Sequence, residues 1–153
     1  MSVDRLRMRR ATAGLTSHGE FGPFSNAVDL APMMLAAYRG TPDDEGETIA
    51  DTVDVLSDAM AGEWGEWVED ASFVALEDSV PVGAVLTAMA DDLPFISFVF
   101  TPPEQQGQGV ATRLIARAGE ALAERGHATV DLWVNPASER AVNLYRHLGF
   151  EEI

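Results

Sequence analysis

The strongest constraint on the fold of this chain is a glycine-rich turn between a buried strand and a long helix. Residues 95–101 are almost continuously apolar, which is typical of a strand buried on both faces of a sheet. Residues 110–125 then carry apolar side chains at helical spacing, and Gly126 ends the pattern. Between them stands the sequence Gln106-Gly107-Gln108-Gly109-Val110-Ala111. Glycines let a backbone approach a ligand closely, and the free N–H groups of a first helical turn favour an anion. The sequence therefore predicts an anion-binding turn here.

The rest of the pattern predicts one domain, 1–153, with helices covering a mixed sheet. Residues 6–12 alternate apolar and basic side chains, as in an edge strand, and residues 13–24 are expected to form a loop. The expected order is β-α-α-β-β-β-α-β-α-β, an α+β (mixed α/β) fold with a mostly antiparallel sheet. Its further strands are 72–76, 80–88, 129–134 and one beginning at Phe150, and its further helices are 27–38, one capped by Thr48, and 138–148.

Charge and composition exclude several classes of protein. A net charge of −15 argues against general nucleic-acid binding, which needs a basic surface. The same acidity would attract cationic small molecules, or serve solubility alone. Cysteine is absent, and His18, His127 and His147 show no metal-ligand spacing, so no metal is expected. No run of 18 apolar residues and no apolar signal core occur, which predicts a cytoplasmic protein without membrane contact.

A Gly-x-Gly turn alone does not identify the anion. Dinucleotide-binding folds also use glycines after a strand, but they place them near the N-terminus and need an acidic residue about 20 positions later. Here the glycines lie two-thirds along the chain, after an expected hairpin. A P-loop is excluded because no Gly-Lys-Ser/Thr follows.

A second group of residues makes the match specific. Asn135 lies at the end of a predicted strand, and Ala141, Leu144, Tyr145 and Gly149-Phe150 follow it. Together with Gln106, Gly109 and Ala111, this pattern resembles the GNAT superfamily of acyl-CoA-dependent N-acetyltransferases. That family's phosphate motif is Gln/Arg-x-x-Gly-x-Gly/Ala. The resemblance is firm over residues 95–151, and the order of elements extends it to nearly the whole chain.

The resemblance implies acetyl-CoA as co-substrate and a direct attack by a primary amine. The pyrophosphate would lie on N–H groups of residues 107–112, and the pantetheine arm would run beside strand 95–101. A bulge within residues 99–101 would point an N–H at the thioester oxygen, and Asn135 would hold the arm from the opposite strand. The expected acetyl-CoA-binding residues are Val99, Phe100, Thr101, Gln106, Gly107, Gln108, Gly109, Val110, Ala111, Thr112, Asn135 and Ser138.

The same resemblance implies Tyr145 as the general acid that protonates the leaving thiolate, although a core tyrosine is the alternative. Asp131 is the candidate base, unless its side chain faces outward. Glu45 and Glu47 would bind or deprotonate a cationic amine, or form a solvated turn. Trp64 and Trp67 are expected to pack in the core or a lid, with substrate contact as the other interpretation. The alternative function is a non-catalytic acyl-CoA-binding or regulatory module, or part of a larger acetyltransferase assembly.

One departure concerns the last residues. Most members of the superfamily continue past Gly-Phe with two strands, whereas this sequence ends at Ile153. The final strand is therefore expected to be missing from the sheet: either the sequence is truncated, or another chain or segment completes the sheet. Because an open sheet edge invites association, the sequence predicts a homodimer.

Overall fold

The computed structural model describes residues 4–24 and 26–153. Its strands form one sheet in the order β2-β4-β5-β6-β7-β1-β8, with β3 paired to β5. The bounds of the strands are β1 Leu6–Ala11, β2 Glu20–Pro23, β3 Glu66–Trp67, β4 Phe73–Glu77, β5 Val80–Ala90, β6 Leu93–Phe100, β7 Thr129–Val134 and β8 Glu151–Glu152. The helices are α1 Ala27–Tyr38, α2 Ile49–Met60, α3 Val110–Glu124 and α4 Glu139–His147, with short 3-10 turns η1 Glu69–Ala71 and η2 Pro103–Gln105. This arrangement confirms the predicted mixed fold.

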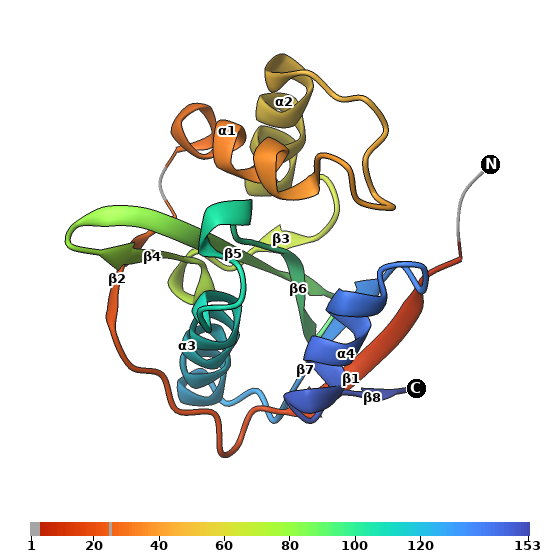
Figure 1. The fold of residues 1–153 in the computed structure, drawn as a ribbon. Coiled ribbons are helices and arrows are strands. Elements are labelled where there is room, and N and C mark those ends of the chain that lie inside the picture. Colours follow the sequence, from red (N-terminus) through yellow and green to blue (C-terminus); the bar gives the residue numbers. More distant parts are fainter. Residues whose placement is uncertain (1–3, 25) are drawn as a thin grey trace.

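The helices cover the sheet in two layers. Figure 1 shows α1 and α2 together on one side of the sheet and α3 on the other. The apolar face of α3, including Leu114, Ile115 and Leu122, packs in one core cluster with residues of β5, β6, β7 and α4. A second cluster joins α1 and α2 to the opposite face, through residues such as Leu86 and Phe100. Burial on both faces explains the continuous apolar sequence of β6.

Local signals set the starts of the first two helices. The Asn26 side chain accepts hydrogen bonds from the N–H groups of Val28 and Asp29, at the start of α1. Thr48 and Asp51 form a reciprocal capping box at the start of α2, which confirms the predicted cap. Ser138 occupies the N-cap position of α4, but its side chain makes no capping hydrogen bond.

Strand β1 is not the edge strand that its sequence predicts. It lies between β7 and β8 and pairs antiparallel with both. Met8 is fully buried on the face that α3 covers, while Arg7 and Arg9 pair with Asp131 on the other face. The edge of β7 opposite β6 is therefore covered by this chain's own first strand.

Strand β2 also differs from the sequence prediction. Residues 20–23 were expected in a loop but form β2, which pairs with β4. Gly22 and Pro23 weaken any strand pattern there, so this strand depends on its partner and on the edge-to-face packing of Phe21 against Phe73.

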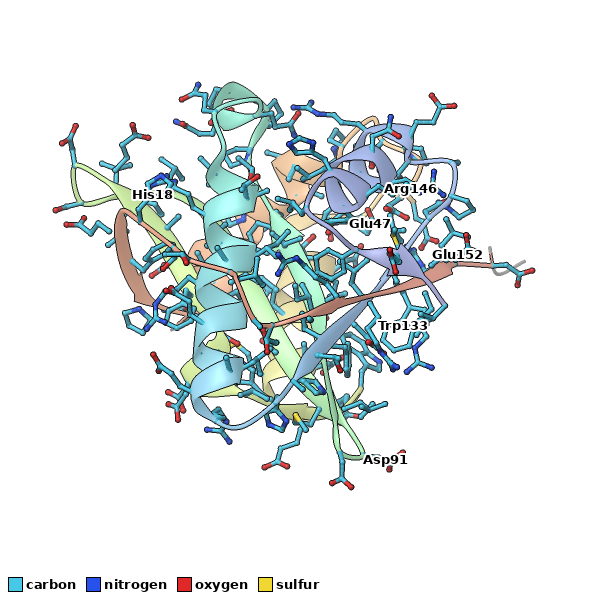
Figure 2. The ribbon with its side chains drawn as sticks, turned by 90° about the horizontal axis from the view of Figure 1, so that it is seen from below. His18, Glu47, Asp91, Trp133, Arg146 and Glu152 are labelled. Atoms are coloured by element: carbon cyan, nitrogen blue, oxygen red, sulfur yellow. The ribbon has the colours of Figure 1, made fainter. Side chains whose placement is uncertain are left out.

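The β4–β5 hairpin is confirmed, and Asp91 occupies the tip of the β5–β6 turn with a positive φ of 57°. Figure 2 shows Asp91 projecting there, well apart from Glu47.

Within the described residues, every helix is too short or too polar to span a membrane.

Candidate functional site

A cleft of about 1010 Å³ opens where β6 and β7 diverge. The two parallel strands pair at Phe95 with Asp131 and at Ile96 with Leu132, near their beginnings. Beyond these pairs, residues 97–101 and 133–135 line the cleft from its two sides. Backbone groups that leave a sheet ladder need other partners, so this gap suits an extended ligand with amides of its own.

A bulge occurs in β6, but not where the sequence prediction placed it. Leu86 pairs with Phe98 and Thr87 pairs with Ile96, which leaves Ser97 as the extra residue. The expectation of a bulge within residues 99–101 is therefore wrong by at least two positions. The bulge turns Phe98 to the same side as Phe95, since an extra residue reverses the alternation of side chains.

The predicted anion-binding turn, residues 106–111, lies at one end of this cleft. Gly107 and Gly109 both have left-handed backbone conformations, with φ of 79° and 80°, which favour glycine. Gly109 is the N-cap of α3 and supplies no side-chain cap, so N–H groups of the first turn are left for a ligand. The Gln108 side chain is turned to the carbonyl of Glu104, 3.2 Å away, and Gln108 does not line the cleft.

The other predicted coenzyme-binding residues all line the cleft. They are Val99, Phe100, Thr101, Gln106, Gly107, Gly109, Val110, Ala111, Thr112, Asn135 and Ser138. Thr101 is 8% exposed, and its Oγ1 is buried without a hydrogen-bond partner among the described residues. An unpaired buried hydroxyl costs about 1–3 kcal/mol, which a ligand in the cleft would recover. The Thr101 hydroxyl is thus free to form a hydrogen bond with a polar coenzyme arm.

Asn135 connects the two sides of the cleft. Its Oδ1 accepts the N–H of Ala137 at 3.0 Å, which orients the amide at the end of β7. Its Nδ2 donates to Asp43 Oδ1 at 3.3 Å, and Arg5 Nη2 donates to the same oxygen at 3.0 Å. Asp43 belongs to the α1–α2 loop, so this hydrogen bond connects the loop to the end of β7.

Two tyrosines line the same part of the cleft, Tyr145 from α4 and Tyr38 from α1. Burial, together with the nearby charge of Asp43, raises the pKa of Tyr145 to about 12. The pKa of Tyr38 is also raised, by burial first and then by the charges of Tyr145 and Asp43. Both hydroxyls are therefore protonated at neutral pH and can act as proton donors. The phenol ring of Tyr145 packs edge-to-face against Phe150, with centroids 6.0 Å apart.

Acidic and aromatic side chains also line the cleft. Asp43, Glu45 and Glu47 from the α1–α2 loop all line it. Trp64 is half exposed and packs edge-to-face on Phe98, at a centroid distance of 6.3 Å. Trp67 instead lies outside the cleft and donates from Nε1 to Ser72 Oγ at 3.0 Å. The two tryptophans thus differ, since Trp67 packs in the fold and Trp64 faces the cleft.

Asp131, the candidate base, does not line the cleft. Its carboxylate accepts hydrogen bonds from Arg7 and Arg9 at 2.6–3.0 Å. Burial opposes its ionisation, but the two guanidinium groups outweigh this and hold the pKa of Asp131 below its usual value. An ionised carboxylate with two arginine partners is a poor proton acceptor. The prediction that Asp131 is the base is therefore not supported, and its structural role is to hold β1 against β7.

Three features in the cleft or beside it were not predicted. Arg140, in the first turn of α4, donates from Nη1 to Gln106 Oε1. Trp133 lines the cleft from β7 and is 41% exposed; Figure 2 shows it projecting outward. Gly83 in β5 lets α3 approach, because a Cβ there would lie 2.8 Å from Val110 Cγ1. None of the three belongs to the two sequence motifs, so only spatial proximity reveals them.

Among residues 4–24 and 26–153, no group of three or more histidines and carboxylates is arranged to hold a metal ion.

Comparisons with known proteins agree with this geometry. The chain is 36% identical to a mycothiol acetyltransferase from Thermobifida fusca over 153 residues, which cover 99% of this chain and 42% of that protein. It is 32% identical to an uncharacterized N-acetyltransferase from Methanocaldococcus jannaschii over 104 residues, covering 58% of this chain and 46% of that protein. The chain thus spans less than half the length of these curated relatives.

Solved structures share the fold at lower sequence identity. A GCN5-related N-acetyltransferase from Sphaerobacter thermophilus superposes with a TM-score of 0.71 and 19% identity, covering 99% of this chain and 50% of that one. AAC(6')-Iy, in complex with the bisubstrate analog CoA-S-monomethyl-acetylneamine, superposes with a TM-score of 0.63 and 21% identity, covering 89% of this chain and 92% of that one. The family profile described as acetyltransferase (GNAT) family matches residues 43–150. With this match over most of its length, the chain belongs to the GNAT acetyltransferase family.

Proposed function

We propose that this chain transfers an acetyl group from acetyl-CoA to a primary amine of a small molecule or peptide. The observation that carries the proposal is that the N-terminal turn of α3, the diverging ends of β6 and β7, and Tyr145 all line one cleft. An anion site, a partner for an extended amide arm and a proton donor are the three elements that acetyl-CoA chemistry needs in one place.

Acetyl-CoA would lie with its pyrophosphate on the N–H groups of residues 107–112. Its pantetheine arm would follow the backbone of Val99 to Thr101, with Asn135 and Ser138 on the opposite side. The unpaired hydroxyl of Thr101 supports this placement, because it lies where the arm passes from β6 to α3.

The neutral amine would attack the thioester carbonyl carbon and form a tetrahedral intermediate with the charge on oxygen. A backbone N–H of the unpaired β6 segment would stabilise that oxyanion, an effect commonly of a few kcal/mol. Collapse of the intermediate breaks the C–S bond, and Tyr145 donates its proton to the leaving thiolate. Because the pKa of Tyr145 is raised, its hydroxyl is present as the acid over the whole neutral range.

The acceptor amine is proposed to be cationic when it arrives. Asp43, Glu45 and Glu47 surround the end of the cleft beyond Tyr145, and Trp64 adds an aromatic wall. Ammonium groups bind well between carboxylates and aromatic faces. Glu47 is half-buried and is the proposed acceptor of the amine proton.

An amine panel tests the proposal. Thiol release from acetyl-CoA is followed with diamines, amino acids, aminoglycosides and N-terminal peptides, alongside calorimetric binding of acetyl-CoA. We expect micromolar to millimolar binding and turnover highest with amines that carry a second positive charge. Binding without thiol release on any amine would instead favour the non-catalytic acyl-CoA-binding module or part of a larger assembly. No binding at all would reject both.

We also propose that the protein is cytoplasmic and forms a homodimer. Since β1 covers β7, an association through the sheet would have to use the outer edges, at β8 or β2. Light scattering over a range of concentrations tests the dimer, and a monomer at high concentration would contradict it.

A further inference from the structure

Cations are scarce in the cleft, although its proposed coenzyme is strongly anionic. In the described part of the chain, the cleft is lined by two cationic residues, Arg5 and Arg140. The chain as a whole has a net charge of −15, so the general field repels an anion. A local positive charge is therefore needed near the phosphates, in addition to the N–H groups of α3.

The two arginines differ in their partners. Arg5 forms an ion pair with Asp43 at 3.0 Å, and its charge is compensated there. The ion pairs between described residues involve Arg5, Arg7, Arg9, Arg39 and Arg125, and Arg140 is not among them. Arg140 is thus the cleft cation whose charge no carboxylate of the described residues offsets by contact.

Hydrogen bonds place Arg140 beside the anion-binding turn. Its Nη1 donates to Gln106 Oε1, and Gln106 Nε2 donates to the carbonyl of Thr101 at 3.1 Å. This relay joins the first turn of α4 to the end of β6 and to the residues that precede α3. The same relay ends at Thr101, whose Oγ1 is the buried hydroxyl without a partner. The guanidinium of Arg140 and the unpaired hydroxyl of Thr101 thus line the same cleft as the first turn of α3.

We propose that Arg140 is the phosphate-binding side chain of this cleft and that it contacts the diphosphate of the coenzyme together with the Thr101 hydroxyl. Only one nitrogen of the Arg140 guanidinium donates to Gln106, so other N–H groups remain for a phosphate, which they can bind in bidentate geometry. The inference rests on the proposed acetyl-CoA site, and it adds a residue that lies in neither part of the glycine motif. Arg140 acts on affinity and not on the chemical step.

Calorimetry of Arg140→Gln tests this role with ligands that lose successive phosphates. The ligands are acetyl-CoA, its dephospho form without the 3′-phosphate, and acetylpantetheine without any phosphate. We expect Arg140→Gln to raise the Kd of the first two about tenfold, as for a lost charged hydrogen bond, and to leave acetylpantetheine unchanged. Arg140→Lys should recover part of the loss in affinity.

Arg146→Gln is the matched control, because Arg146 lies on the same helix, is exposed and does not line the cleft (Figure 2). It should bind all three ligands as the unmodified chain does. An unchanged Kd in Arg140→Gln, or an equal loss for acetylpantetheine, would overturn the proposal. A loss for acetyl-CoA but not for its dephospho form would also overturn it, since the contact would then be to the 3′-phosphate.

Failure of the proposed function gives a different result. A chain that binds adenosine diphosphate but not acetyl-CoA would reject the acetyltransferase function. The Arg140 proposal would then be judged on adenosine diphosphate, whose Kd should rise in Arg140→Gln and stay constant in Arg146→Gln. No rise there would overturn the proposal as well.

Discussion

Asn135 donates a hydrogen bond from Nδ2 to Asp43 Oδ1 across the cleft, over 3.3 Å. The contact joins the end of β7, where the coenzyme arm is proposed to lie, to the loop that carries the acidic residues of the acceptor end. The carboxylate of Asp43 is also the charged group that raises the pKa of Tyr145 beyond the effect of burial. The Asp43 side chain is thus linked to the proposed coenzyme site through its hydrogen bond with Asn135, and to the proposed general acid Tyr145 through its charge.

Asp43→Asn should lower the pKa of Tyr145 from about 12, because the amide removes the negative charge beside the phenol. The pKa should stay above the ordinary value near 10, since burial remains. The chain has two tyrosines, so ultraviolet titration in a Tyr38→Phe background reports on Tyr145 alone. Asp44→Asn is the neighbouring control. An unchanged titration after Asp43→Asn, with the fold intact by circular dichroism, would contradict the electrostatic link.

Tyr145→Phe should cut turnover at least about tenfold and leave the Kd of acetyl-CoA nearly unchanged, because a general acid acts on the leaving group and not on binding. Steady-state kinetics with the best amine of the panel, together with calorimetry, provide the measurement. Tyr38→Phe, the other tyrosine of the cleft, should affect turnover less. Equal turnover in Tyr145→Phe would remove Tyr145 from the mechanism.

Thr101→Val should weaken acetyl-CoA binding several-fold without destabilising the ligand-free chain. The hydroxyl has no partner among the described residues, so its removal loses no internal hydrogen bond. Deleting an unsatisfied buried polar group is commonly neutral or stabilising. Urea unfolding without ligand and calorimetry with acetyl-CoA measure the two effects. A large loss of stability in the ligand-free chain would show that the hydroxyl serves the fold instead.

Gly83→Ala should lower the free energy of unfolding by about 1–3 kcal/mol, as is usual for overpacking. The new Cβ would lie 2.8 Å from Val110 Cγ1 and 3.0 Å from the carbonyl oxygen of Phe100. Relieving this clash would push the first turn of α3 away from the sheet, so the binding of acetyl-CoA should weaken too. Gly107→Ala is the comparison, because its new Cβ would meet open space and the substitution changes only the backbone preference of the residue. If Gly83→Ala costs less than Gly107→Ala, the close packing of α3 on β5 is not the reason for this glycine.

Asp131→Asn should destabilise the chain at neutral pH, by a few kcal/mol at most because both arginines are partly exposed. The folded-state pKa of Asp131 is lowered, so its stabilisation is present above the unfolded value near 3.9 and is lost as the pH falls through the folded value. Urea unfolding from neutral to acidic pH should therefore show the difference from the unmodified chain shrinking on acidification. A difference that is independent of pH would contradict this ion-pair account.

The sequence by itself determined the parts of this protein that depend on local patterns. Helix α3, the buried strand β6 and the turn between them follow from apolar periodicity and from two glycines that adopt left-handed conformations. The helix boundaries Ala27–Tyr38 agree with the prediction because the cap and the apolar stripe are both local signals. The motif around Asn135 and Tyr145 sufficed for the family, which the match over residues 43–150 confirms.

Tertiary structure decided everything that depends on long-range partners. Strand β1 has the alternating sequence of an edge strand, and only pairing with residues far along the chain, such as Arg7 with Trp133, places it between β7 and β8. Asp131 is chemically suited to be a base, but two arginines from β1 hold it ionised outside the cleft. Arg140 and Asp43 reach the site through contacts between separate elements. A local pattern carries no information on such contacts, because a side chain's charge state and partners are set by what the fold brings beside it.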